Sequence, residues 1–123
     1  MNSSSIAFVG GGNMASALVG GLLKAGRAAS SIHVVEPFAA QRDQLARQFG
    51  VAVPAAAGAA LEGCGLVAWA VKPQLFAAAA APCAPFVGEA LQLSVMAGIR
   101  SATIVRATGS ERVVRAMPNT PAL

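Results

Sequence analysis

A glycine-rich segment near the N-terminus has the residue types and spacing needed to hold a phosphate group. Gly10, Gly12 and Ala15 occupy the three key positions of a GxGxxA pattern. Gly10 permits a tight turn, Gly12 lets the backbone approach a pyrophosphate without a Cβ in the way, and Ala15 lets a helix pack closely on a strand. Backbone N–H groups at the start of that helix would then face the phosphates. The pattern indicates dinucleotide binding; an ordinary glycine-rich turn is the alternative.

Glu36 is placed to select between the two forms of the dinucleotide. It ends an apolar, β-branched run about 20 residues after the glycine pattern, where a carboxylate accepts hydrogen bonds from the adenosine ribose hydroxyls. A carboxylate there would repel a 2′-phosphate, which favours NAD(H) over NADP(H). Against this, Arg42 lies in the next predicted helix and could reach a phosphate. The alternative for Glu36 is a solvent-exposed carboxylate at a strand end.

Two further segments end apolar runs of the sequence. Residues 70–73, Ala-Val-Lys-Pro, follow a continuous apolar run, and ligands of open α/β sheets bind outside such carboxyl ends. Lys72 is the charge beside this run, and a lysine that merely keeps its ammonium group in water is the alternative. Residues 95–97, Val-Met-Ala, end the next run, where a small-residue turn would lie under the nicotinamide ribose. We therefore expect both segments at the cofactor.

No other set of residues predicts catalysis by the side chains themselves. The one histidine, His33, lies within a predicted strand, and the spacing of Cys64 and Cys83 fits neither a redox CxxC motif nor a zinc site. We interpret all three as structural and expect no metal. The carboxylates are few and scattered, so paired acid–base catalysis is not indicated. The chemistry should reside on a bound cofactor, which the protein positions.

The elements that must position these residues alternate between short strands and helices. Predicted strands cover residues 6–9, 31–36, 51–53, 66–71, 91–96 and 112–117, and predicted helices cover residues 14–25, 38–49, 55–63, 74–81 and 101–108. Such alternation predicts βαβ crossovers and a parallel sheet with helices on both faces. The expected fold class is α/β, a Rossmann-like doubly wound parallel sheet in a single domain.

Composition limits the remaining classes of function. The chain has 123 residues, enough for one domain, and its apolar content of 55% excludes a disordered chain. The net charge of +4 comes from scattered basic residues, and tyrosine is absent, so no nucleic-acid partner is expected. Glycines break the apolar run over residues 6–23, and Pro82 and Pro85 break the run over residues 75–88. We therefore expect neither a signal peptide nor a membrane span.

Three segments together resemble one enzyme family. Residues 8–15 (FVGGGNMA), 70–74 (AVKPQ) and 115–123 (RAMPNTPAL) look like those of pyrroline-5-carboxylate reductase in order and spacing, and the resemblance spans the whole chain. The glycine loop is generic, whereas the second and third segments are far more specific. The resemblance implies a cytoplasmic enzyme of proline biosynthesis that reduces the C=N bond of 1-pyrroline-5-carboxylate to L-proline with hydride from NADPH or NADH.

The resemblance also implies which residues contact the cofactor. It adds Asn13 and Met14 to the glycine loop and places Asn119 and Thr120 near the reaction centre, whereas the catalytic residues themselves are not identified. With Glu36, the expected cofactor-binding residues are Val9, Gly10, Gly11, Gly12, Asn13, Met14, Ala15, Glu36, Ala70, Val71, Lys72, Pro73, Val95, Met96 and Ala97.

The sequence departs from the family pattern in two respects. Family members continue past residues 117–121 into a helical domain that forms the homo-oligomer and supplies most of the substrate site. The resemblance therefore implies that residues 1–123 are an incomplete NAD(P)-binding domain, truncated before that domain. Alanines also fill positions 55–57, where the family commonly offers a polar side chain near the adenosine.

Two alternative functions are open at this stage. One is a truncated, catalytically inactive module that binds a dinucleotide on its own. The other is a β-hydroxyacid-type dehydrogenase, against which the segment at residues 115–121 speaks.

Overall fold

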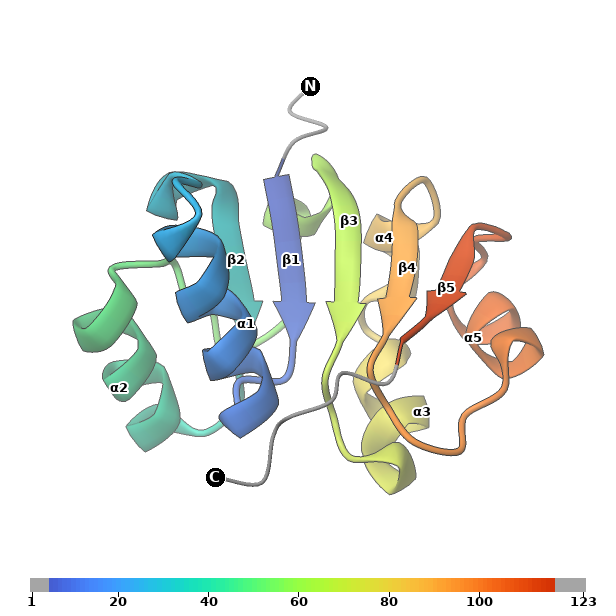
Figure 1. Ribbon diagram of the computed structural model, residues 1–123. Coiled ribbons are helices and arrows are strands. Elements are labelled where there is room, and N and C mark those ends of the chain that lie inside the picture. Colours follow the sequence, from blue (N-terminus) through green and yellow to red (C-terminus); the bar gives the residue numbers. More distant parts are fainter. Residues whose placement is uncertain (1–4, 117–123) are drawn as a thin grey trace.

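A parallel β-sheet forms the centre of the molecule. The computed structural model describes residues 5–116, and within them the sheet has five strands in the order β2-β1-β3-β4-β5. All neighbouring strands run parallel, so their carboxyl ends share one edge of the sheet (Figure 1). The strands are β1 (Ser5–Val9), β2 (Ile32–Val35), β3 (Cys64–Trp69), β4 (Leu91–Ser94) and β5 (Val113–Arg115). This arrangement confirms the expected Rossmann-like sheet.

Helices cover both faces of the sheet, as a doubly wound fold requires. Two helices lie in front of β1 and β2, and three lie behind β3, β4 and β5 (Figure 1). The front pair is α1 (Asn13–Lys24) and α2 (Ala39–Phe49); the rear set is α3 (Phe76–Ala80), α4 (Ala84–Val87) and α5 (Ser101–Thr108). Short 3-10 turns, η1 (Ala29–Ser31), η2 (Ala59–Leu61) and η3 (Pro73–Leu75), complete the connections.

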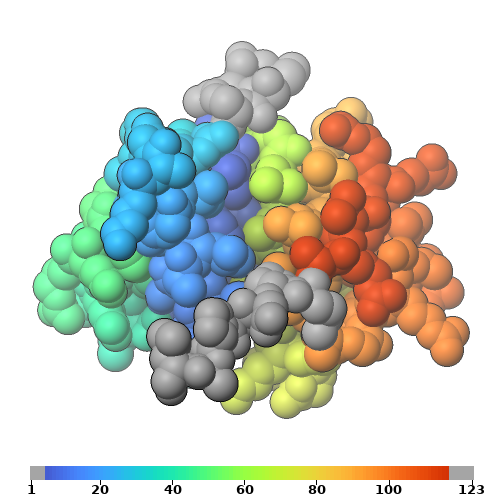
Figure 2. Space-filling view, in the orientation of Figure 1, coloured from blue at the N-terminus to red at the C-terminus, as the bar shows by residue number. Residues whose placement is uncertain are grey.

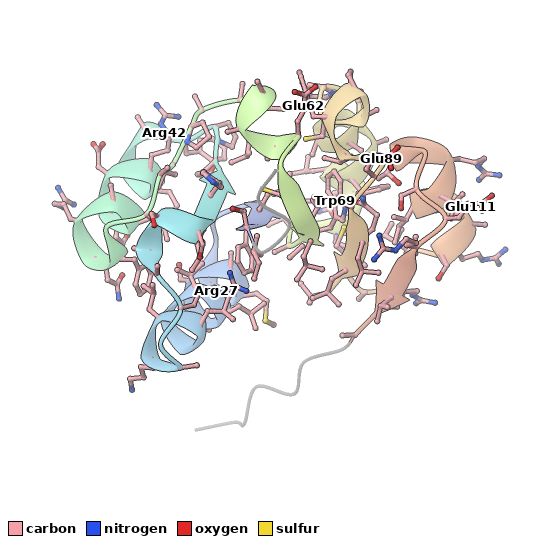
Figure 3. The ribbon with its side chains drawn as sticks, turned by 90° about the horizontal axis from the view of Figure 1, so that it is seen from above. Arg27, Arg42, Glu62, Trp69, Glu89 and Glu111 are labelled. Carbon is pink, nitrogen blue, oxygen red and sulfur yellow. The ribbon has the colours of Figure 1, made fainter. Side chains whose placement is uncertain are left out.

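Two apolar cores lie on opposite faces of the sheet, because successive side chains of a strand point to opposite faces. In β3, Val67 and Trp69 pack in the core beneath α3 to α5, whereas Ala68 packs in the core beneath α1 and α2. The Trp69 ring meets Phe76 edge to face at 5.2 Å, and its Nε1 donates to Gln92 Oε1 at 2.8 Å. Trp69 lies well inside the molecule in Figure 3. The two cores hold the sheet between the helix layers.

The helices on the front face leave part of the sheet uncovered. An apolar groove of about 300 Å³ lies between α1 and strands β3 and β4, lined by side chains that include Leu18, Leu66 and Leu93. Figure 2 shows β3 and β4 reaching the surface beside α1. In β4 the alternation is inverted: Gln92 and Ser94 are buried, whereas Leu93 is half-buried. The rear face of β4 is therefore the more fully enclosed one.

Two predicted elements between β2 and β3 are wrong. The predicted strand at residues 51–53 is reduced to one bridge between Ala52 and His33, supplemented by hydrogen bonds from Val34 N to Ala52 O and from Glu36 N to Pro54 O. Pro54 has no N–H to continue the ladder, so the strand cannot extend. The predicted helix at residues 55–63 is reduced to η2 over Ala59–Leu61. The alanines before it offer too little apolar area to hold a longer helix against the sheet.

The region of Pro82 and Pro85 also differs from its prediction. One helix was expected over residues 74–81, but the structure has η3 followed by α3. A further short helix, α4, follows the first proline and contains the second in its first turn. A proline in the first turn is tolerated, because the N–H that it lacks would have no partner inside the helix. The prolines therefore separate two short helices, α3 and α4, instead of ending the helical region.

Candidate cofactor site

Three of the predicted segments meet at one edge of the sheet. Gly10 N donates to Val35 O at 2.9 Å, Ala70 N donates to Val9 O at 2.9 Å, and Val95 N donates to Trp69 O at 3.1 Å. These bonds continue the strand ladders by one step and bring the chain ends after β1, β3 and β4 side by side (Figure 1). β3 and β4 end at Trp69 and Ser94, earlier than predicted, so residues 70–73 and 95–97 lie in loops. The sequence thus placed its candidate segments correctly.

The first half of the glycine loop, Gly10 and Gly11, is packed against its neighbours. Gly10 has φ +101°, and a Cβ there would lie 2.7 Å from the Ala70 carbonyl oxygen. At Gly11 a Cβ would lie 2.7 Å from Leu45 Cδ1 and 3.0 Å from Glu36 Oε1. Both distances are shorter than ordinary van der Waals contact. Neither position has room for a side chain in this conformation.

The second half of the loop, Gly12 and Asn13, is open. A Cβ at Gly12 would meet no atom of residues 5–116 within 4 Å, and both residues are exposed. Gly12 is the N-cap of α1, and no side chain among the described residues caps this helix end. The first N–H groups of a helix have no partner within it, and the helix dipole adds partial positive charge there. Ala15 is buried against the sheet, as predicted. The described residues therefore leave the first N–H groups of α1 without a side-chain cap.

The Glu36 side chain is buried and forms a hydrogen bond with the glycine loop. The residue is only 6% exposed, so the alternative of a solvent-exposed carboxylate is wrong. Oε1 accepts the Gly11 N–H at 2.8 Å, and Oε2 accepts the Phe38 N–H at 3.0 Å. Gln41 Nε2 donates to the Gly11 carbonyl oxygen from α2. The carboxylate thus fixes both the glycine loop and the segment after β2.

Arg42 lies near this carboxylate but binds the backbone. Its Nη1 donates to the carbonyl oxygens of Pro37 at 2.7 Å and Glu36 at 3.1 Å. The side chain comes from the first turns of α2 and lies at the periphery of the molecule in Figure 3. The guanidinium group therefore stands beside the end of β2, within the region where a 2′-phosphate was considered.

The loops after β3 and β4 contain both exposed and buried residues. Lys72 is exposed, and its carbonyl oxygen accepts the Leu75 N–H at 2.8 Å in the turn that begins η3. Met96 is buried, and its N–H donates to Ser94 Oγ at 3.2 Å. Asn119 and Thr120, which the resemblance places near the reaction centre, lie outside the described residues.

The two cysteine thiols are buried, and their properties fit a structural role. Cys64 and Cys83 are buried free thiols, and burial raises the pKa of Cys64 and raises the pKa of Cys83 to about 11. Both would be protonated at neutral pH, consistent with a structural role. Among residues 5–116, no group of three or more His, Cys, Asp or Glu side chains could hold a metal ion. Over the same residues, no helix is both long and apolar enough to cross a membrane.

Two residues at the site were not found from the sequence. Gln41 binds the Gly11 carbonyl oxygen, and Phe38 is 71% exposed beside Glu36. Nothing in the helical pattern of residues 38–49 distinguishes Gln41 from the other polar residues of α2. Phe38 did carry a signal, because it is a large aromatic residue directly after a strand-ending Glu-Pro pair.

The parallel sheet, the glycine-rich loop that opens α1 and the acidic residue ending β2 are the defining features of the Rossmann-like dinucleotide-binding class. The chain belongs to the family described as NADP oxidoreductase, coenzyme F420-dependent, whose model matches residues 5–98.

Proteins with established names refine this assignment. Pyrroline-5-carboxylate reductase from Pseudomonas aeruginosa is 41% identical over 100% of this chain and 46% of its own length. The solved structure of a pyrroline-5-carboxylate reductase from Coxiella burnetii matches with a TM-score of 0.88 and 32% identity, over 98% of this chain and 46% of that one. These findings confirm the resemblance found in the sequence. The chain spans about half the length of the curated relatives it matches.

A more distant solved structure shows the same fold. Plasmodium falciparum pyrroline carboxylate reductase, with NADP bound, matches with a TM-score of 0.79 and 24% identity, over 98% of this chain and 44% of that one.

Proposed function

We propose that the chain is the cofactor-binding part of a pyrroline-5-carboxylate reductase, with residues 1–123 forming its NAD(P)-binding domain. The observation that carries this proposal is the open, uncapped N-terminus of α1 at Gly12, beside a loop half that is closed to side chains. The identity of 41% to the Pseudomonas aeruginosa reductase over the whole chain supports the choice of reaction. A stand-alone dinucleotide-binding module is the second candidate, and the comparisons do not favour it.

The residues present fit a bound NADPH or NADH. The space above Gly12, which a Cβ would enter, suits a pyrophosphate close to the backbone N–H groups of the first turn of α1. Residues 70–73 and 95–97 end neighbouring strands, so their main chain can position the nicotinamide ribose. When bound, the reduced nicotinamide supplies a hydride. The chain's own contribution is to hold the cofactor and orient its reactive ring at the sheet edge.

The substrate and the assembly are further parts of the proposal. The substrate would be 1-pyrroline-5-carboxylate, whose C=N carbon accepts hydride most readily when the ring nitrogen is protonated. Asn119 and Thr120 are proposed to lie near that carbon on the strength of the resemblance alone. We also propose a cytoplasmic homo-oligomeric enzyme, in keeping with the buried free thiols of Cys64 and Cys83.

Calorimetric titration of the purified chain with NADPH and with NADH tests the proposal. We expect saturable binding of each cofactor at one site per chain. Because the chain spans about half the length of its relatives, we expect no steady-state reduction of 1-pyrroline-5-carboxylate by these 123 residues alone. Absence of binding by a folded sample would overturn the proposal, and robust turnover would show that the site is more complete than described.

Cofactor choice tests the role of Glu36. We expect both cofactors to bind, with NADH disfavoured by no more than about tenfold, because the carboxylate repels a 2′-phosphate while the nearby Arg42 attracts it. Glu36→Ser should shift the ratio of affinities toward NADPH. The ratio is the right measure, because losing the Gly11 contact would weaken both cofactors alike. An unchanged ratio would show that Glu36 supports the loop without contacting the ribose.

A further inference from the structure

Phe38 has an unusually exposed aromatic side chain, and its backbone N–H binds the same carboxylate as the glycine loop. Its side chain is 71% exposed, compared with 52% for Leu75 and 48% for Val114. It follows Glu36 and Pro37 at the carboxyl end of β2, on the side of the sheet edge where the loop after β1 also ends. A single exposed apolar side chain is ordinary on a protein surface, so exposure alone assigns it no role.

The backbone that carries this ring is held on both sides. The Phe38 N–H donates to Glu36 Oε2 at 3.0 Å, and the Phe38 carbonyl oxygen accepts the Arg42 N–H at 3.0 Å in the first turn of α2. Arg42 Nη1 also donates to the Pro37 carbonyl oxygen at 2.7 Å. A ring on a fixed backbone loses little conformational freedom when a ligand stacks on it.

The same carboxylate connects Phe38 to the predicted phosphate site. Glu36 binds the Phe38 N–H with one oxygen and the Gly11 N–H with the other. A dinucleotide whose pyrophosphate lies at Gly12 and whose ribose lies at the end of β2 extends its base beyond that ribose. Phe38 is the large apolar group that the structure provides there. Positions 55–57, where the resemblance implies a polar side chain near the adenosine, are alanines.

We propose that the Phe38 ring is the surface on which the purine base of the dinucleotide stacks. The inference rests on the proposed cofactor function and adds to it the residue that holds the adenosine end. Stacking depends on a flat aromatic face and not on the donors and acceptors of the base. The site should therefore accept a hypoxanthine dinucleotide nearly as well as the adenine form.

Titration with ADP-ribose tests this role, because that ligand carries the base and the pyrophosphate without the nicotinamide. Phe38→Ala should weaken ADP-ribose binding about tenfold, the usual effect of removing a stacked aromatic ring. Phe38→Tyr should bind within about twofold of the parent, whereas Phe38→Leu, which keeps apolar bulk without a flat face, should behave like Phe38→Ala. Val114→Ala, at another exposed apolar position away from the loop, should bind like the parent.

The outcomes separate this inference from the function on which it rests. If the parent binds ADP-ribose and Phe38→Ala or Phe38→Leu binds it equally well, stacking on Phe38 is wrong and the cofactor function stands. If the parent binds neither ADP-ribose nor NADPH, the cofactor function itself fails, and the inference fails with it. If Phe38→Tyr keeps the parent's affinity for ADP-ribose and Phe38→Leu does not, the stacking role is supported. If the side chain served only to fill apolar space, leucine would keep the affinity too.

Discussion

The two halves of the glycine loop differ in what surrounds them. Gly10 and Gly11 face the Ala70 carbonyl oxygen, Leu45 and Glu36 at distances that leave no room for a Cβ, whereas Gly12 faces open space. The first half therefore serves the fold, because its glycines allow β1, β2 and β3 to converge. The second half is not packed against other described residues. Glycines of one sequence motif thus meet two separate requirements, and substitutions can test each requirement alone.

The largest effect on stability should come from Gly10→Ala. The φ of +101° is strained for alanine, and its Cβ would lie 2.7 Å from a backbone oxygen that cannot move away easily. We expect the free energy of unfolding to fall by about 3 kcal/mol or more, measured by urea denaturation.

Gly26→Ala is the matched control for that substitution. Gly26 also has φ +101°, but a Cβ there would meet nothing within 4 Å. Gly26→Ala should lower the free energy of unfolding only by the cost of the strained backbone, about 1 to 2 kcal/mol. Equal losses at Gly10 and Gly26 would show that the contact with Ala70 does not matter, and the packed half of the loop would lose its explanation.

Gly11→Ala should have an intermediate effect. Its Cβ would press on the end of the Leu45 side chain and on the Glu36 carboxylate, and both can shift by a few tenths of an ångström. We expect a loss of about 1 to 2 kcal/mol in the free energy of unfolding. Gly12→Ala serves as the control, with a change near 0.5 kcal/mol or less. If Gly12→Ala destabilised the chain as much as Gly11→Ala, the two halves would not differ.

Gln41→Ala should have the smallest effect. It removes the hydrogen bond from the side-chain amide to the Gly11 carbonyl oxygen, which is partly buried. The expected loss is about 0.5 to 1 kcal/mol in the free energy of unfolding, the usual net value of one such bond. Gln44→Ala, on an exposed part of the same helix, should change the stability less. Equal values for the two variants would mean that Gln41 does not support the loop.

Much of the fold was predictable because hydrophobic pattern and glycine positions agree. The helix at residues 101–108 was predicted with its observed bounds, although Arg100 and not Ser101 is its N-cap residue and no side chain caps this end. The strand predicted at residues 51–53 is only a single bridge in the structure, because Pro54 has no N–H to continue the ladder. A proline pattern likewise concealed α4, because Pro85 occupies a first turn instead of ending a helix.

Where the candidate residues lie in the fold was predictable, but the contacts among them were not. The spacing of Gly10, Gly12 and Glu36 placed them correctly on the topology, since these positions follow from strand order alone. The inward bonds of Glu36 to Gly11 and Phe38 depend on how the backbone turns after β2. The spacing of residues in the sequence does not show how the backbone turns there. For the same reason it could not identify Gln41 as the residue that binds the loop.

Cofactor binding by Gly12→Val tests the central claim most directly. A Cβ at this position meets no described residue within 4 Å, so the fold should persist with a stability change of about 1 kcal/mol. The account predicts that calorimetric titration with NADPH then shows affinity reduced at least about tenfold relative to the parent. Binding equal to that of the parent, by a variant shown to be folded, would contradict the assignment of the pyrophosphate to this end of the helix.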